Sequence, residues 1–242
     1  MLVLLLAAAL GGCASIPKED RDPRDPLERY NRAVFSFNET MDRWVLKPVA
    51  EGYQRVTPEP VDRSVSHFFG NLEDIGNLFN NALQLKFDRA ISDLGRITFN
   101  TTLGVFGLFD VASHMGFEKH NEDFGQTLGY WGMPSGPYFV VPFLGPSTVR
   151  DTGALVVDYG VSPYYYLSLT DEEALALGAL RIVDLRAGLL STTRLLEDAA
   201  IDPYAFQRDA WLQNRLYEVH DGDPPVSDEE MDFLDDLDGV GF

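Results

Sequence analysis

The segment from Phe124 to Val149 constrains the fold more than any other, because it has no charged side chain in a chain that is 24% charged. It is long enough to cross a bilayer as a helix. Proline inside a helix removes a hydrogen bond and clashes with the preceding turn. A single membrane-spanning helix is therefore excluded by Pro134, Pro137, Pro142 and Pro146.

The same segment also holds five glycines and several aromatic residues, namely Phe124, Tyr130, Trp131, Tyr138, Phe139 and Phe143. Irregular backbone at membrane depth must be covered by protein or face a water-filled cavity, because lipid cannot satisfy its polar groups. We therefore expect either a bent hairpin that contacts lipid or a buried loop of the kind found in soluble enzymes.

The N-terminus resembles an export signal. Residues 1–12 form an apolar run that ends in small residues directly before Cys13, the only cysteine. The run is too short for a membrane span and is typical of a secretory signal, although no Lys or Arg precedes it. Leu10 to Cys13 resembles the bacterial lipobox, in which the chain is cut before the cysteine and the cysteine is acylated. A plain signal peptide with an incidental cysteine is the alternative.

Cys13 is accordingly the expected lipidation site. Several acyl chains anchor a protein stably, since each buried methylene contributes about 0.8 kcal/mol. Residues 13–26 are charged and contain proline, so we expect a flexible tether. The residue after Cys13 is Ala14. It differs from the aspartate that retains enteric lipoproteins at the inner membrane, and this difference favours the periplasmic face of the outer membrane.

The charge is strongly negative, with a formal value of −19, and nine acidic residues lie between Asp221 and Asp238. Residues 221–242 therefore form an acidic tail. Nucleic-acid binding and docking to anionic lipid both need clustered Lys and Arg. We expect no nucleic-acid partner, and any contact with the membrane has to come from apolar and aromatic surface.

Apolar residues recur at helical spacing along residues 27–220, which we interpret as one helical domain. The stripes predict helices over residues 27–45, 65–83 and 88–103. Lys47-Pro48 is expected to end the first helix. Each stripe faces either a soluble core or, in a lipid-anchored chain, the membrane plane.

Two further helices follow in the second half of the chain. Thr170 and Glu173 form a capping box that opens a long helical pattern ending near Leu196. Pro203 suits the first turn of a helix over residues 202–218. Alternating strand patterns are scarce, and Tyr138–Val141 is the best candidate. The sequence therefore predicts an all-α fold.

Little in the sequence indicates catalysis. The dinucleotide-binding and P-loop motifs are absent, so no cofactor is predicted, and the histidines match no helical zinc pair, so no metal site is predicted. Ser135 lies near glycines but outside a nucleophile-elbow motif. Asp151 and Asp158 are the acid–base candidates of an enzyme, although Arg150 is a nearby ion-pair partner.

The run from Phe124 to Asp151 closely resembles the signature of the MlaA (VacJ) family of outer-membrane lipoproteins. Further segments that match the family are Asp25–Arg32, Phe35–Asn38, Lys47–Ala50, Phe69–Leu72 and Arg96–Val111. The resemblance covers about residues 24 to 218 in order, so the signal and the acidic tail lie outside it.

The resemblance implies a ring-like bundle of amphipathic helices that lies in the membrane plane around a polar channel. It also implies that phospholipids mislocalised to the outer leaflet pass through this channel to the periplasmic carrier MlaC, with no bond made or broken. Trimeric porins of the OmpC/OmpF type are the implied partners that hold the ring. A membrane-anchored lipid or cell-wall hydrolase and a purely structural porin-associated lipoprotein are the alternatives.

The resemblance also assigns site residues. Ser36 and Phe37 match a position in the first helix that influences the channel state. The family's flexible glycine loop corresponds to Gly132–Gly136, in which Pro134 replaces the middle glycine and is expected to limit its mobility. Arg150 and Asp151 belong to the same expected channel and hinge.

A porin-contacting helical hairpin corresponds approximately to Glu122–Pro142. The contact residues expected within it are Tyr130, Trp131, Tyr138, Phe139 and Val141.

Overall fold

The computed structural model describes residues 22–163, 167–197 and 201–225. Cys13, the signal and most of the acidic tail lie outside these ranges. The elements are α2 (Glu28–Met41), η3, a π-helix (Asp42–Leu46), α3 (Lys47–Val56), α4 (Glu59–Leu83), α5 (Phe87–Thr102), α6 (Val111–His114), α7 (Phe124–Tyr130), β1 (Tyr138–Val141), β2 (Gly145–Thr148), α8 (Val149–Val161), α9 (Asp171–Glu197) and α10 (Pro203–Val219). The predicted all-α class is confirmed, with one small two-stranded sheet.

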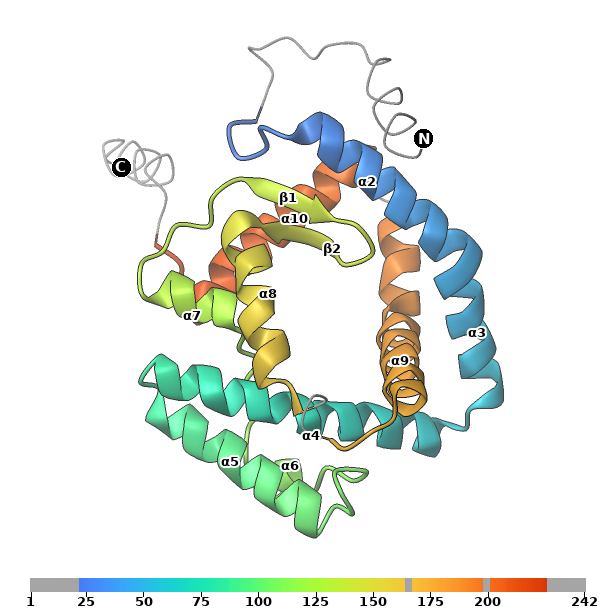
Figure 1. The fold of residues 1–242 in the computed structure, drawn as a ribbon, viewed down its shortest axis with the longest axis vertical. Coiled ribbons are helices and arrows are strands. Elements are labelled where there is room, and N and C mark those ends of the chain that lie inside the picture. Colours follow the sequence, from blue (N-terminus) through green and yellow to red (C-terminus); the bar gives the residue numbers. More distant parts are fainter. Residues whose placement is uncertain (1–21, 164–166, 198–200, 226–242) are drawn as a thin grey trace, which may run out of the picture.

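The helices follow one another around a ring (Figure 1). The continuous run of α2, η3 and α3 forms one side, α4 the next, and α7, α8 and the β-hairpin the side opposite α3. α5 packs along α4 outside the ring, α9 lies on the inner side of α3, and α10 lies beside the hairpin.

Side chains are distributed in the opposite sense to a soluble domain. Among the described residues, 21 buried side chains are polar or charged and 11 are hydrophobic, whereas soluble interiors are dominated by apolar residues. Large apolar residues lie on the surface instead, with Trp44 76%, Phe106 74% and Phe143 71% exposed. No described helix is both long and apolar enough to cross a bilayer. The predicted apolar stripes therefore face outward over much of the ring.

α4 carries the clearest example of this inversion. Its buried residues are Phe69, Asn71, Asp74, Asn77, Asn80 and Asn81. The polar ones are three or four residues apart, so they share one face of the helix. Val61, Phe79 and Leu83 of the same helix are exposed.

The prediction that Lys47-Pro48 ends the first helix is wrong. Pro48 lies in the first turn of α3, which continues directly from η3. Proline cannot donate a backbone hydrogen bond. The Lys47 N–H bonds to the Asp42 carbonyl, one residue further back than in an α-helix, and this π-type turn lets the chain continue past Pro48.

Two asparagines on α2 attach the hairpin to the ring. The Asn31 side chain accepts a hydrogen bond from the Val140 N–H at 2.9 Å and donates to the Tyr138 carbonyl at 3.1 Å. Asn38, two helical turns later, accepts from the Phe143 N–H at 2.9 Å and donates to the Val141 carbonyl at 3.2 Å. These amides satisfy the free edge of β1, which would otherwise be left unpaired.

The hairpin rests on a small aromatic core. Tyr138, Val140 and Tyr204 are buried together, and Trp211 of α10 packs against them. β1 pairs with β2 in antiparallel register, Tyr138 opposite Thr148. The strand over Tyr138–Val141 is thus confirmed, while β2, α7 and α8 were not predicted. The expected helical hairpin over Glu122–Pro142 is wrong: the segment forms α7, a loop and β1.

Candidate functional site

A cavity of about 790 Å³ lies between α10 and the loop that joins α7 to β1. The loop contributes Gly132, Met133, Pro134, Ser135 and Gly136 to its wall, and α8 contributes Arg150. α10 supplies an apolar strip of Leu212, Leu216 and Val219 next to polar groups. The wall is therefore amphipathic, with charged and apolar parts side by side.

Gly132 and Gly136 fix the path of this loop. Their φ angles are +86° and +69°, a region that non-glycine residues rarely adopt. The loop is also bonded to the start of α8, because the Arg150 N–H donates to the Ser135 carbonyl at 3.1 Å and Arg150 Nη1 donates to the Met133 carbonyl at 3.3 Å. The loop thus covers Arg150.

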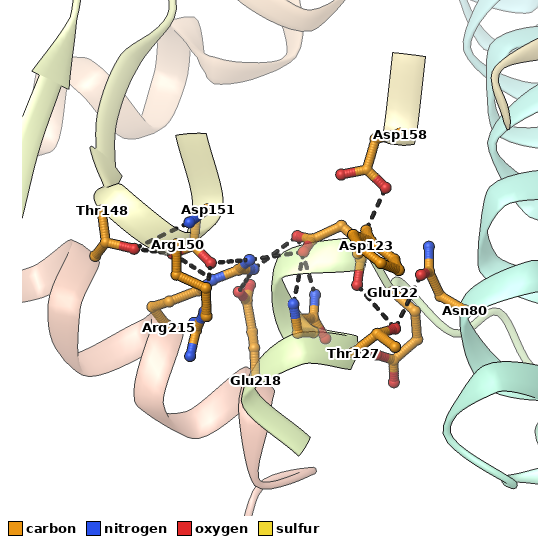
Figure 2. A network of polar contacts seen from close by, with 12 residues as sticks. Asn80, Glu122, Asp123, Thr127, Thr148, Arg150, Asp151, Asp158, Arg215 and Glu218 are labelled. Carbon is orange, nitrogen blue, oxygen red and sulfur yellow. Dashed lines mark hydrogen bonds and ion pairs between the residues drawn. The ribbon is translucent and has the colours of Figure 1, made fainter. Parts of the chain in front are cut away.

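A buried ionic network begins at the base of this cavity (Figure 2). Arg215 of α10 donates to both carboxylate oxygens of Asp123, at 2.6 and 2.7 Å, and to Asp151 of α8 at 3.0 and 3.2 Å. Its side chain is only 9% exposed. Buried charges persist in proteins when they are paired and hydrogen-bonded, so Arg215 joins α7, α8 and α10 through their polar residues.

Two helix caps belong to this network. Asp123 accepts from the Gln126 N–H at the start of α7. Thr148 caps α8 and donates from its hydroxyl to Asp151 at 2.7 Å. Burial opposes ionisation of Asp123 and Asp151, but the bonds and charge of Arg215 outweigh it and hold both pKa values below the ordinary range.

Asp158, on the same helix as Asp151, behaves differently. Burial raises its pKa to about 6, against the hydrogen bond that it accepts from the Phe124 N–H at 2.9 Å. It lines a second cavity, of about 540 Å³, together with Asn77 and Asn80 from the buried polar face of α4. Acidic side chains gather on its wall, since Glu122, Asp123 and Glu218 also line it.

Comparison with known proteins identifies the family. The family model described as MlaA lipoprotein matches residues 23–218. The chain belongs to the MlaA lipoprotein family.

Individual relatives agree. The chain is 33% identical over 249 residues, with 98% of each chain covered, to the "Intermembrane phospholipid transport system lipoprotein MlaA" of Escherichia coli (strain K12). It is 36% identical over 196 residues, 81% of this chain and 76% of the relative, to an uncharacterised protein of Rickettsia bellii (strain RML369-C). A solved structure reported as "Structural basis for maintenance of bacterial outer membrane lipid asymmetry" matches with a TM-score of 0.72 and 32% identity, covering 82% of this chain and all of that one.

The structure brings some of the residues assigned from the MlaA resemblance together. Gly132, Pro134, Gly136 and Arg150 line one cavity, and Asp151 is bonded to Arg150 in the adjoining network. Ser36 and Phe37 do not join them. Both are exposed on α2, Ser36 beside a small cavity of about 240 Å³ and Phe37 with its ring 5.1 Å from Phe143 at the hairpin tip.

The residues assigned to porin contact fall into three groups. Tyr130 and Trp131, at the end of α7, are 44% and 61% exposed. Phe139 and Val141 are half-buried, and Phe139 stacks on Tyr30 of α2 at 5.2 Å. Tyr138 is completely buried in the aromatic core beneath the hairpin. Strand alternation turns its side chain toward α10, so in this conformation it is not on the surface.

Sequence reasoning missed the residues that organise the site. Arg215 was not singled out, because a lone arginine on a helix carries no pattern. The polar face of α4 did have a signal: Asn71, Asp74, Asn77, Asn80, Asn81 and Gln84 recur at helical spacing. The helix was interpreted only from its apolar stripe, so the polar stripe on its other face was not recognised.

Proposed function

We propose that this chain removes phospholipids mislocalised to the outer leaflet of the outer membrane and passes them toward a periplasmic carrier, maintaining lipid asymmetry. The observation that carries the proposal is the inverted ring: many of its large apolar side chains are exposed, while most of its buried side chains are polar or charged. Membership of the MlaA family supplies the class of cargo, since relatives are described as lipoproteins of an intermembrane phospholipid transport system.

The inverted ring suits a phospholipid because the two ends of this molecule need different surroundings. Its charged head requires a polar, hydrated path, and its acyl tails require lipid or apolar protein. Between the ring helices, Arg150 and Arg215 line one cavity, and Asn77, Asn80 and Asp158 line another, so both cavity walls offer polar groups. Exposed residues such as Trp44 and Phe106 provide apolar surface for the bilayer, and ring helices lying in the membrane plane fit that distribution.

The finer parts of the proposal concern anchoring and partners. Cys13 is the proposed site of acylation, and the periplasmic face of the outer membrane is the proposed location. Tyr130 and Trp131 are the residues best exposed for a trimeric porin. An MlaC-type carrier is the proposed acceptor on the periplasmic side. The anchor, the location and the carrier rest on the family resemblance, and the porin contact rests also on the exposure of Tyr130 and Trp131.

A hydrolase is the competing function, and Asp151 would be its natural acid or base. The ion pairs of Asp151 with Arg150 and Arg215 hold its pKa low. General acid–base catalysis works best with a pKa near the working pH. This arrangement favours a structural role for Asp151 within the network.

Deleting the gene tests the function directly. We expect phospholipid to accumulate in the outer leaflet and sensitivity to detergent with chelator to rise, both reversed by the intact chain. Outer-leaflet lipid labelling that is identical in deletion and parent strains would refute the proposal. A purely structural porin lipoprotein predicts porin association without any change in leaflet composition.

Cross-linking in cells tests the partner assignment. A photo-reactive residue at Trp131 should give porin adducts, and the same residue at buried Tyr138 should give none. Adducts formed only from α2 or α3 would contradict the assigned contact surface.

A further inference from the structure

We infer that the cavity beneath the Gly132–Gly136 loop is a phosphate-binding site in which Arg150 holds the head of a phospholipid. This inference rests on the proposed function and goes further, because it names the residue and the chemical group it recognises. Its starting point is an unpaired donor. The Arg150 side chain is 3% exposed, yet its Nη2 atom has no hydrogen-bond partner among the described residues.

The remaining donors of Arg150 are bonded, but one of them weakly. Nε donates to Asp151 at 2.9 Å, and Nη1 donates to the Met133 carbonyl at 3.3 Å. A buried donor without a partner is destabilising, and more so when it is charged. Arg150 lines the cavity, so an anion that displaced the covering loop would find this donor without a partner.

The acids nearby are already occupied. Asp123 and Glu218 bond to Arg215, and Asp151 is shared between Arg215 and Arg150. Figure 2 shows the end of the Arg150 side chain directed away from Asp123. None of these acids therefore takes up the Nη2 donor of Arg150.

Arg96 is a buried arginine of the same chain that has no unpaired nitrogen. Its side chain is 4% exposed. All three of its side-chain nitrogens are bonded, with Asp74 at 3.0 Å, Ser113 at 2.9 Å and Asp110 at 3.3 Å among the partners. Arg96 is thus a matched reference: equally buried, fully paired and outside the cavity wall.

The rest of the wall fits an amphiphile rather than a free ion. Leu212, Leu216 and Met133 line the cavity together with Arg150. Its volume of about 790 Å³ falls within the range of small-molecule sites. A guanidinium pairs with phosphate in bidentate geometry. A phosphate that replaced the Met133 carbonyl would accept from Nη1 and Nη2 together, while the first carbons of the lipid contacted the leucines.

The covering loop can yield to such a ligand. It is bonded to Arg150 through Met133 and Ser135, and it begins and ends at Gly132 and Gly136, whose positive φ angles let the backbone turn. Nothing lies within 4 Å of the position that a Cβ atom would take at Gly132. The loop therefore has space on that side.

Binding of defined probes to the full chain in detergent tests the inference. The probes are short-chain phosphatidylethanolamine, the matching diacylglycerol without phosphate, and inorganic phosphate. The variants are Arg150→Gln, Arg150→Lys and, as the buried control, Arg96→Gln. We expect Arg150→Gln to bind the phospholipid at least about tenfold more weakly, corresponding to about 1.4 kcal/mol, with diacylglycerol binding unchanged. Arg150→Lys should lose less, and Arg96→Gln should bind like the parent chain.

Two outcomes would overturn the inference. The first is equal phospholipid affinity in the parent chain and in Arg150→Gln. The second is inorganic phosphate binding as tightly as the phospholipid, which would make this a site for free anions. Thermal unfolding of each variant checks the fold. If Arg150→Gln does not fold, Arg150→Lys decides: it keeps the charge but loses the bidentate geometry, so unchanged ³¹P chemical shifts of the bound lipid would count against the site.

Failure here remains distinguishable from failure of the proposed function. If deletion disturbs leaflet composition while Arg150→Gln restores it fully and binds lipid normally, only the Arg150 site is wrong. If deletion has no effect on leaflet composition, the proposed transport function is wrong whatever Arg150 binds.

Discussion

Asp151 and Asp158 lie on the same helix, but their neighbours move their pKa values in opposite directions. Arg215 and Arg150 stabilise the charged form of Asp151. Asp158 is half-buried, and the loss of hydration together with the nearby charge of Asp123 raises its pKa to about 6. At the scale of single residues, pairing with Arg215 and Arg150 keeps Asp151 ionised, whereas Asp158 binds a proton near neutral pH.

Asp158→Asn should therefore stabilise the chain at neutral pH. The folded state holds the Asp158 proton more tightly than the unfolded state, whose pKa is near 3.8. Protonated Asp158 therefore stabilises the fold fully below pH 3.8. This stabilisation is lost as the pH rises through about 6, where the folded-state carboxyl ionises. We expect a higher Tm for the variant at pH 7.5 and no difference at pH 4. Glu39→Gln, at an exposed position on α2, is the control. A variant less stable than the parent at pH 7.5 would contradict the argument.

Arg215→Gln should be severely destabilising. It leaves Asp123 and Asp151 without their main buried partner, and removing one member of a buried pair typically costs about 3–5 kcal/mol. Urea unfolding in detergent measures the change in free energy. Arg63→Gln breaks only an exposed pair with Glu59 and should cost less than about 1 kcal/mol. Similar losses in the two variants would show that the network contributes little.

At the scale of elements, the hairpin and α2 form one unit. The free edge of β1 is paired by side chains instead of a third strand, through Asn31 and Asn38. The first of these asparagines is completely buried. The stability of the hairpin therefore depends on a helix that lies more than a hundred residues earlier in the sequence.

Asn31→Leu should release the hairpin from α2. It leaves the Val140 N–H and the Tyr138 carbonyl without partners in a buried environment, at about 1–3 kcal/mol for each group. Hydrogen exchange at the Val140 amide should accelerate, and the free energy of unfolding should fall. Asn214→Ala removes only a bond to Glu218 on the exposed side of α10 and is the control. Unchanged exchange at Val140 would show that the strand edge is held by other contacts.

The sequence predicted helices correctly where apolar residues recur at helical spacing or where capping residues mark the start of a helix. The helix over Phe87–Thr102, the capping box at Thr170 and Glu173, and the helix that opens at Pro203 all occur as predicted. Between Phe124 and Val161 it predicted β1 but missed α7, β2 and α8. There Asp123 caps α7 and Thr148 caps α8, and both caps depend on contacts with Arg215 or with its partner Asp151.

The site was predicted only in part for the same reason. The glycine loop and Arg150 could be assigned by resemblance, and the structure places them around one cavity. No local pattern could show that Tyr138 points inward, because either face of a four-residue strand can be the buried one. Nor could it show that the asparagines of α4 face the interior, since the usual rule assigns that side to the apolar stripe.

At the scale of the whole molecule, the inverted ring implies that the bilayer is part of the folding environment. The apolar residues that a soluble protein would bury are on the surface, and the buried residues are mainly polar. Burying one large apolar side chain contributes about 1.5–3 kcal/mol. Several such residues on the ring thus carry more membrane affinity than a single acyl chain, whose binding is marginal.

Membrane association should therefore survive the loss of the lipid anchor. We expect a Cys13→Ser chain, exported with a cleavable secretory signal, to remain with the membrane fraction and to float with zwitterionic vesicles at high salt. Adding Trp44→Asp and Phe106→Asp should release it, because charges at 76% and 74% exposed apolar positions oppose contact with lipid. Asn214→Asp in the same background is the control. A Cys13→Ser chain that is monomeric, stable and wholly soluble without detergent would mean that the ring is a soluble domain on a tether, and the transport proposal would lose its structural basis.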